Sequence, residues 1–288
     1  MRYLVLLVLL MILPFVLRCQ ELPAYRLYNV LGEEIEFGEM ITQLDGADVI
    51  LFGEMHENPI AHWLELEVTK ALFESVGDKL VLGAEMFEAD NQLIIDEYLQ
   101  GLIKTNHFED NVRLWNNYST DYKPLVEFAV ANGLGFIATN IPRRYASMVA
   151  RGGFESLNAL SEDAKRFIAP LPMPYDGELN CYKQMMNMNG MPGKMHSDNL
   201  PKAQASKDAT MAINISRNMP TDGKFLHFNG RYHSDNKESI VWYLDDYAPD
   251  LKVMTISTTL NQSLAMPAEE LNFADFMIVI PESMTRTY

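Results

Sequence analysis

The sequence predicts an α/β protein with a mainly parallel central sheet and helices on both of its faces. Short and almost wholly apolar segments recur along the chain, as in 47–53 (ADVILFG) and 80–85 (LVLGAE). Amphipathic helical stretches lie between them, and this alternation is typical of a parallel sheet that is buried on both sides. The 288 residues are 48% hydrophobic and 22% charged, which suffices for one substantial core.

The elements can be assigned in chain order. Residues 27–37 predict a small hairpin or edge strand, with Gly32 at its turn. Asn58 and Pro59 are typical of a helix start, and further helices are expected over 91–102 and 125–131. The apolar segments that predict strands are 47–53, 80–85, 134–139, 224–229, 251–257 and 276–280.

The first 19 residues have the pattern of an export signal. Arg2 supplies a positive charge, and the apolar run 4–17 that follows is shorter than the roughly 20 residues that span a bilayer. Residues 20–288 are then expected to form a single domain. Cys19 stands where bacterial lipoproteins are cleaved and acylated, but Arg18 before it is larger than the residue that such sites require. The sequence therefore predicts export, with a lipid anchor on Cys19 and ordinary cleavage just after it as the two alternatives.

Charge and cysteine content exclude several classes of function. The net charge is −16, from 23 basic and 39 acidic residues, so the chain repels the phosphates of nucleic acids. Cys19 and Cys181 are the two cysteines of the sequence, and Cys19 belongs to the signal. An internal disulfide and a cysteine-rich metal site are therefore not expected in the mature chain.

One segment, 170–201, interrupts the alternation of strands and helices. It is rich in Pro, Gly and Asn and contains six of the 18 methionines, which are Met173, Met185, Met186, Met188, Met191 and Met195. A long irregular segment with flexible, polarizable side chains favours a lid over an apolar ligand. The alternative is a helical hairpin whose methionines fill gaps in the core.

Polar side chains gather where the predicted strands end. In a parallel sheet these ends meet at one edge, where ligands bind. Glu54 and His56 follow the first predicted strand on the same side of the chain, and His62 comes about one turn into the next helix. The ends of the later strands carry Glu85, Asn140, Arg143, Arg144, Arg231, Tyr232 and His233.

Carboxylates together with imidazoles are typical of metal sites and of general acid–base catalysis. Glu54, His56, Glu85 and His233 are therefore candidates both for catalysis and for binding a divalent metal ion. A single histidine is more often structural than functional. His107 and His227 are expected to be structural, whereas His196 in the Met-rich segment stays open.

The order of these motifs resembles the ChaN-like haem-binding proteins over roughly 47–257. The matching stretches are Gly53–His56 with His62, Glu85–Glu88 with Gln92, Asn140–Arg143, Ala203 and Gln204 with Asp208, Met211 and Ala212, and Asn229–Gly230 with His233. The wider superfamily includes TIKI metalloproteases, TraB-like proteins and erythromycin esterases, which share a Gly-x-x-His element like Gly53–His56.

This resemblance implies haem binding in the cell envelope of a Gram-negative bacterium, for iron or haem uptake. The protein would be periplasmic or an outer-membrane lipoprotein. Its partners would be a second copy, across a pair of stacked haems, and an outer-membrane haem receptor. The chain lacks a Cys-x-x-Cys-His run, so the haem would be held non-covalently. Candidate haem contacts are His56, His62, Tyr182, Tyr232, His233, Arg143 and Arg144, with tyrosine or histidine as axial ligand.

The superfamily also implies a competing function, a metal-dependent hydrolase of protease or esterase type that uses Gly53–His56. Glu54 would then act as general base, and Arg143 or Arg144 would stabilise a developing oxyanion. A third alternative is an envelope scaffold that keeps the fold without the chemistry.

Overall fold

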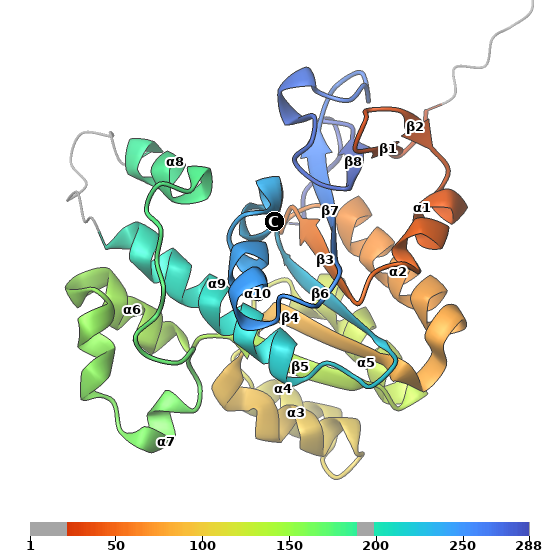
Figure 1. Cartoon of the computed structure of the whole chain (residues 1–288). Helices are drawn as coiled ribbons and strands as arrows, with labels where there is room; N and C mark the ends of the chain where they lie inside the picture. Colours follow the sequence, from red (N-terminus) through yellow and green to blue (C-terminus); the bar gives the residue numbers. More distant parts are fainter. Residues whose placement is uncertain (1–21, 189–198, 288) are drawn as a thin grey trace, which may run out of the picture.

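The computed structural model describes residues 22–188 and 199–287. Within them, one eight-stranded sheet has the order β2-β1-β8-β7-β3-β6-β4-β5 (Figure 1). Strands β3 to β8 pair in parallel, whereas β1 pairs antiparallel with β2 and β8, so the predicted mainly parallel sheet is confirmed. The strands are β1 (Arg26–Asn29), β2 (Glu34–Ile35), β3 (Val49–Glu54), β4 (Leu80–Glu88), β5 (Gly135–Asn140), β6 (Lys224–Gly230), β7 (Val253–Leu260) and β8 (Phe276–Ile280).

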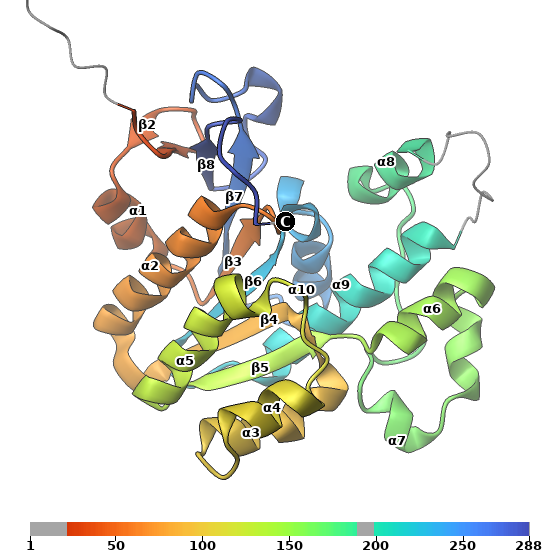
Figure 2. The ribbon, with the colours of Figure 1, turned by 180° about the vertical axis from the view of Figure 1, so that it is seen from behind.

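Helices cover both faces of the sheet. Figure 1 shows α9 and α10 in front of the strands, and Figure 2, from behind, shows α2 and α5 on the opposite face. The helices are α1 (Phe37–Leu44), α2 (Pro59–Val76), α3 (Gln92–Leu99), α4 (Thr105–Asn111), α5 (Lys123–Asn132), α6 (Arg143–Gly152), α7 (Glu162–Lys165), α8 (Asn180–Met188), α9 (Leu200–Arg217) and α10 (Ile240–Tyr247). Two short helical turns matter for the site, η3 (Tyr118–Tyr122) and η5 (Arg231–His233).

Strand β3 lies between two apolar cores, one on each face of the sheet. Ile50 and Phe52 pack in the core on the side of α2 and α5, whereas Val49 and Leu51 pack in the core on the side of α9 and α10. Alternate residues of a strand point to opposite faces, so a strand that is buried on both sides must be apolar at every position. The continuous apolar runs of the sequence reflect this arrangement.

Helix α2 begins as predicted, with Asn58 as its N-terminal cap and Pro59 as its first residue. The side chain of Asn58 accepts hydrogen bonds from the backbone N–H groups of Ile60 (3.0 Å) and Ala61 (3.2 Å). Pro59 is the first residue of the helix, where its missing N–H leaves no hydrogen bond unmade. This cap turns the chain directly after the end of β3, and α2 therefore begins beside the carboxyl edge of the sheet.

Strand β4 is longer than expected and irregular near its end. It runs to Glu88, and its register against β5 shifts between Ala84 and Glu88. Such an irregularity re-aims side chains close to sheet edges. Glu85 lies within the shifted part.

The segment 170–201 is not irregular throughout, because it contains α8 and the first residues of α9. The carboxylate of Glu238 accepts hydrogen bonds from the first backbone N–H groups of α8, at 3.0 Å from Asn180 and 2.7 Å from Cys181. A remote residue thus caps this helix, and local sequence cannot reveal such a cap.

The expected signal segment, and Met191, Met195 and His196 of the Met-rich segment, lie outside the described residues. The proposed lid therefore stays a prediction. Met173 is buried, whereas Met186 is 42% exposed. Among the helices that the structure describes, none is both long enough and apolar enough to cross a membrane.

Candidate functional site

The carboxyl ends of β3, β4, β5 and β6 and the N-terminal half of α9 surround a cavity of about 350 Å³. Its lining includes six of the residues that the sequence places at this edge, His56, Glu85, Asn140, Arg143, Tyr232 and His233. A second cavity of about 280 Å³ adjoins it and shares His56, Gly230 and Tyr232. Tyr232 in η5 is 70% exposed. The structure therefore brings the predicted strand-end residues together at one edge of the sheet.

His56 is held by one carboxylate. Its Nδ1 lies 2.6 Å from Oε1 of Glu54, and its ring meets the ring of Trp115 edge to face at 4.9 Å. A Cβ atom at Gly230 would lie 2.6 Å from Nε2 of His56, so only glycine fits beside this imidazole. Burial disfavours the charged ring, but the hydrogen bond and the charge of Glu54 outweigh burial and raise the pKa of His56. Glu54 therefore favours the charged form of an imidazole that lines both cavities.

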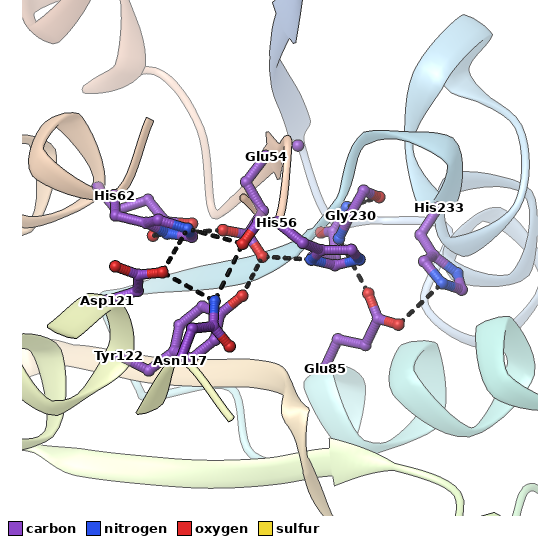
Figure 3. A network of polar contacts seen from close by, with 12 residues as sticks. Glu54, His56, His62, Glu85, Asn117, Asp121, Tyr122, Gly230 and His233 are labelled. Carbon is purple, nitrogen blue, oxygen red and sulfur yellow. Dashed lines mark hydrogen bonds and ion pairs between the residues drawn. The ribbon is translucent and has the colours of Figure 1, made fainter. Parts of the chain in front are cut away.

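Behind His56 lies a buried polar network (Figure 3). Glu54 contacts His62, whose Nδ1 lies 2.8 Å from Oε2 of Glu54 and 3.0 Å from Oε2 of Glu65. Nε2 of His62 lies 3.1 Å from the carbonyl oxygen of His56 and 3.4 Å from Asp121. Burial opposes a charged His62, but its hydrogen bonds to Glu54 and Glu65 and their charges outweigh burial and raise its pKa to about 11.

The two carboxyl groups of this network differ in acidity. Burial alone would raise the pKa of Glu54, but hydrogen bonds from His56 and His62 hold it well below its usual range. Burial and the adjacent charge of Glu54 raise the pKa of Glu65. At neutral pH Glu54 is therefore the carboxylate of the pair.

On the other side of the cavity, His233 lies between two carboxylates. Its Nε2 is 3.1 Å from Oε1 of Glu85, and its Nδ1 makes a very short contact with Oδ1 of Asp208. The charges of Glu85 and Asp208 outweigh burial and raise the pKa of His233 to about 9. The other oxygen of Glu85 accepts a hydrogen bond of 2.9 Å from the N–H of Gly230. Burial alone would raise the pKa of Glu85, but the charge and hydrogen bond of His233 lower it.

Some predicted site residues do not line either cavity. The hydroxyl of Tyr182 donates to Oδ2 of Asp208 at 2.8 Å, and its side chain is buried in the core. His62 lies in the network behind His56. Arg144 pairs with Asp90 at 2.5 Å and stacks over Tyr145. Arg231 touches the second cavity, but Asp235 and Glu270 pair with it at 2.7 and 3.1 Å, so its charge is already balanced.

The four predicted metal ligands form two carboxylate–histidine pairs in the described ranges. His56 is bound to Glu54, whereas His233 is bound to Glu85 and Asp208. The group of potential metal ligands that does come together there consists of Glu54, His62 and Glu65. The metal set predicted from the sequence stays a prediction.

Two histidines expected to be structural lie away from the cavities. His227 is fully buried within β6, 2.7 Å from the hydroxyl of Thr139 and 3.0 Å from Asn229. Burial lowers the pKa of His227 to about 4, so the ring is neutral at pH 7 and has a structural role in the core. His107 is exposed on α4.

Sequence reasoning missed the cation on α9. Lys207 lines the first cavity with Arg143, and neither side chain has an ion-pair partner among residues 22–188 and 199–287. Gln204, Lys207 and Asp208 are three and four positions apart, which places them on one face of a helix. This spacing could have shown from the sequence that Lys207 lies on the same side of the helix as Gln204 and Asp208. Tyr122, Asp121 and Glu65 carried no comparable signal.

Comparisons with known proteins complete the description. The family model "Haem-binding uptake, Tiki superfamily, ChaN" matches residues 40–244. A solved structure titled "Cofacial heme binding to ChaN of Campylobacter jejuni" superposes with a TM-score of 0.66 at 19% identity, covering 89% of this chain and 96% of that chain. A likeness at this identity establishes the shared fold. A comparison with curated proteins found no match.

Two further solved structures are more distant. The type III effector HopBA1 has a TM-score of 0.47 and 12% identity over 85% of this chain and 92% of its own. The RRSP toxin effector domain of Vibrio vulnificus has a TM-score of 0.43 and 19% identity over 74% of this chain and 34% of its own. The family model spans well over half of the 288 residues, and the chain therefore belongs to the ChaN family of haem-binding uptake proteins in the Tiki superfamily.

Proposed function

We propose that this protein binds haem non-covalently at the carboxyl edge of its sheet, with Tyr232 as axial ligand and His56 beside it. The observation that carries the proposal is that Tyr232 and His56 line both cavities at their common boundary. Ferric haem iron accepts a tyrosine ligand. Glu54 holds the His56 ring through Nδ1 at 2.6 Å, so its Nε2 lies beside Gly230 in the wall that the two cavities share.

The two cavities offer what the rest of a haem requires. Their walls carry apolar side chains, among them Trp115 and Ile141 in the first and Met284 in the second. Arg143 and Lys207 supply positive charge for the propionates, and charge-assisted bonds of this kind are about twice as strong as neutral ones. The apolar walls and the two cations would hold the haem, and its iron would add a bond to an axial ligand.

The proposal also covers the location of the protein in the cell and its partners. Family membership and the export signal together favour haem or iron handling in the envelope of a Gram-negative bacterium, at the periplasm or outer membrane. The exposure of Tyr232 leaves room for a second copy to bring its own haem against the first. A homodimer around stacked haems, delivery to or from an outer-membrane receptor, and a lipid on Cys19 are parts of this proposal.

Haem titration of the purified chain tests it. We expect a Soret band that saturates, a changed band shape in Tyr232→Phe, and weaker binding in His56→Ala. Tyr247→Phe, on α10, is the matched control and should bind as the parent does. Loss of the parent's band shape in His56→Ala, but not in Tyr232→Phe, would assign the axial position to His56. No saturable binding by the folded parent chain would refute haem binding.

The second candidate is a hydrolase, favoured by the two carboxylate–histidine pairs that face one cavity, Glu54–His56 and Glu85–His233. The side chain of Glu54 is fully buried, so the neutral form of His56 and not Glu54 would act as the base toward water, and Glu54 would stabilise the ring once it has accepted the proton. His233 would act as the acid because its raised pKa keeps a proton on it at neutral pH. Metal-dependent cleavage of ester or peptide substrates, abolished in His56→Ala, would establish this function in place of haem handling.

A further inference from the structure

The buried group formed by Glu54, His62 and Glu65, here called the inner cluster, has a composition suited to a metal ion. Each residue offers one ligand atom, and these atoms lie within 4.8 Å of one another. All three side chains are buried, at 4% exposure or less. Two carboxylates with one imidazole form a donor set that first-row divalent cations accept.

Oxygen atoms of the inner cluster lack hydrogen-bond donors. Oε1 of Glu65 and Oε2 of Glu54 are buried and have no hydrogen bond in the part of the chain that the structure describes. Oε2 of Glu54 has only the close approach of Nδ1 of His62, at 2.8 Å. Buried polar atoms without partners are rare in native proteins, and burying two acidic side chains next to each other is costly. A bound cation would satisfy both oxygens.

The atoms around the inner cluster are arranged as outer partners of metal ligands. Nε2 of His62 faces the carbonyl oxygen of His56 and the carboxylate of Asp121, which leaves Nδ1 on the side of the two glutamates. Oε1 of Glu54 accepts from Tyr122, whereas Oε2 lies on the side of His62, 2.8 Å from its Nδ1. Imidazole ligands of metals donate their second N–H in this way, to a carboxylate or a carbonyl oxygen.

We propose that Glu54, His62 and Glu65 bind a divalent transition-metal cation such as Mn²⁺ or Zn²⁺ behind the haem cavity. This site is distinct from a metal site formed with Glu85 and His233, and it does not depend on haem binding. On binding, Nδ1 of His62 and the carboxyl group of Glu65 release their protons to solvent, so the doubly positive ion balances the two carboxylates and is coordinated by a neutral His62. Because Glu54 also holds His56, the cation would fix the imidazole that faces the cavities.

A separate approach to the inner cluster exists. His62 and Asp121 line a cavity of about 510 Å³ whose other walls include Thr120, Arg286 and Thr287. The chain near its C-terminal end is held over this region, since the N–H of Thr287 donates to the carbonyl oxygen of Glu57 at 2.9 Å. The cation would thus enter from the α2 side, away from Tyr232 and His233.

The test uses the full chain, stripped with a chelator and equilibrated with Mn²⁺ or Zn²⁺ without haem. We expect about one bound ion per chain by elemental analysis and a higher melting temperature with the ion than without it. Glu65→Gln should abolish binding. Glu67→Gln, on the exposed side of α2, is the matched control, and Glu85→Gln tests the alternative site; both should bind as the parent does. Asp121→Asn should weaken binding on the order of 10-fold or more.

Two results would overturn the proposal. One is a folded parent chain that binds neither cation. The other is binding that persists in folded Glu65→Gln but disappears in Glu85→Gln. If Glu65→Gln does not fold, anomalous scattering from crystals of the parent chain soaked in Mn²⁺ decides: a peak between Glu54 and Glu65 supports the site, and a peak elsewhere or none refutes it. Haem titration of the same preparations reports separately on the proposed haem function.

Discussion

Tyr122 and His56 share a single oxygen atom. The hydroxyl of Tyr122 donates to Oε1 of Glu54 at 2.8 Å, and Nδ1 of His56 lies 2.6 Å from the same atom. The two side chains come from separate elements, η3 and the turn after β3, so their common partner fixes the orientation of the cavity imidazole from inside the core. The wall of the two cavities therefore depends on a buried residue that lines neither of them.

Tyr122→Phe should lower the free energy of unfolding by about 1–2 kcal/mol, because it removes a buried hydrogen bond to a charged acceptor. It should also weaken haem binding several-fold, because Glu54 loses the hydrogen bond from Tyr122 that helps to fix its position and thereby the orientation of His56. Denaturant unfolding and haem titration measure the two effects. Tyr243→Phe is the control, because it removes a buried hydroxyl bonded to the carbonyl oxygen of Pro174 at 2.8 Å, away from the cavities. Equal effects of both variants on haem would contradict the expectation.

His233 should make stability depend on pH. Its pKa in the folded protein, about 9, lies above the unfolded value of about 6.5. The stability that its charged form contributes is complete below pH 6.5 and is lost as pH rises through 9, roughly 3 kcal/mol in all. Unfolding of the parent chain and of His233→Gln should be compared from pH 6 to 10. The advantage of the parent should shrink across this window, and a constant or growing advantage would show that the ring is neutral in the folded state.

Arg143 and Lys207 should contribute to haem affinity through the propionates. The double variant Arg143→Ala/Lys207→Ala should bind haem on the order of 10-fold more weakly, with an unchanged Soret maximum because no axial ligand is altered. The same variant should bind haem dimethyl ester, which lacks both negative charges, as well as the parent chain does. Lys165→Ala, a surface lysine paired with Glu162, is the charge control. Equal losses for haem and its ester would assign the two cations a structural role.

Glu238 should control the stability of α8. Glu238→Gln removes the negative charge at the start of this helix and at least one of its two N–H acceptors, which should cost about 1 kcal/mol locally. Amide hydrogen exchange should be faster across α8 and unchanged in α2. Glu178→Gln, an exposed glutamate just before α8, is the control. Unchanged exchange in α8 would mean that packing alone holds the helix.

Export should remove the first residues of the chain. Mass spectrometry of protein isolated from its native source should find a mature N-terminus at Cys19 or just after it. A diacylglycerol adduct on Cys19 would establish anchoring, whereas Gln20 as first residue would establish ordinary cleavage. An intact segment 1–17 would contradict export by this route.

The strands could be predicted well because each is buried on both faces. Burial at every position leaves a continuous apolar run, as in β3 and β8, and such a run is visible without any knowledge of neighbours. For the same reason His56, Glu85 and His233 could be placed at one edge, because parallel strands all end there. The cap of α2 by Asn58 was predictable since all its atoms lie within three residues.

The partners of these side chains could not be predicted. Asp208 is 25 residues from His233, and Tyr122 is 68 residues from Glu54. No local pattern links such pairs, because helices that arrive from different parts of the chain bring them together. The metal set of Glu54, His56, Glu85 and His233 stays a prediction, and the partner that the sequence did not reveal is Asp208 beside His233. Tyr182 was expected at the ligand, although tertiary packing commits its hydroxyl to Asp208.

The bond between Tyr182 and Asp208 has a thermodynamic consequence. Tyr182 belongs to α8, and Asp208 is also the partner of His233, so one carboxylate connects a helix of the Met-rich segment to a proton at the cavity. If packing of α8 against the protein makes protonation of His233 more favourable, protonation must make the packing of α8 more favourable by the same free energy. The acidity of the compartment and the seating of this helix are therefore reciprocal variables, and the ring resonances of His233 would report the position of α8 without any probe attached to it.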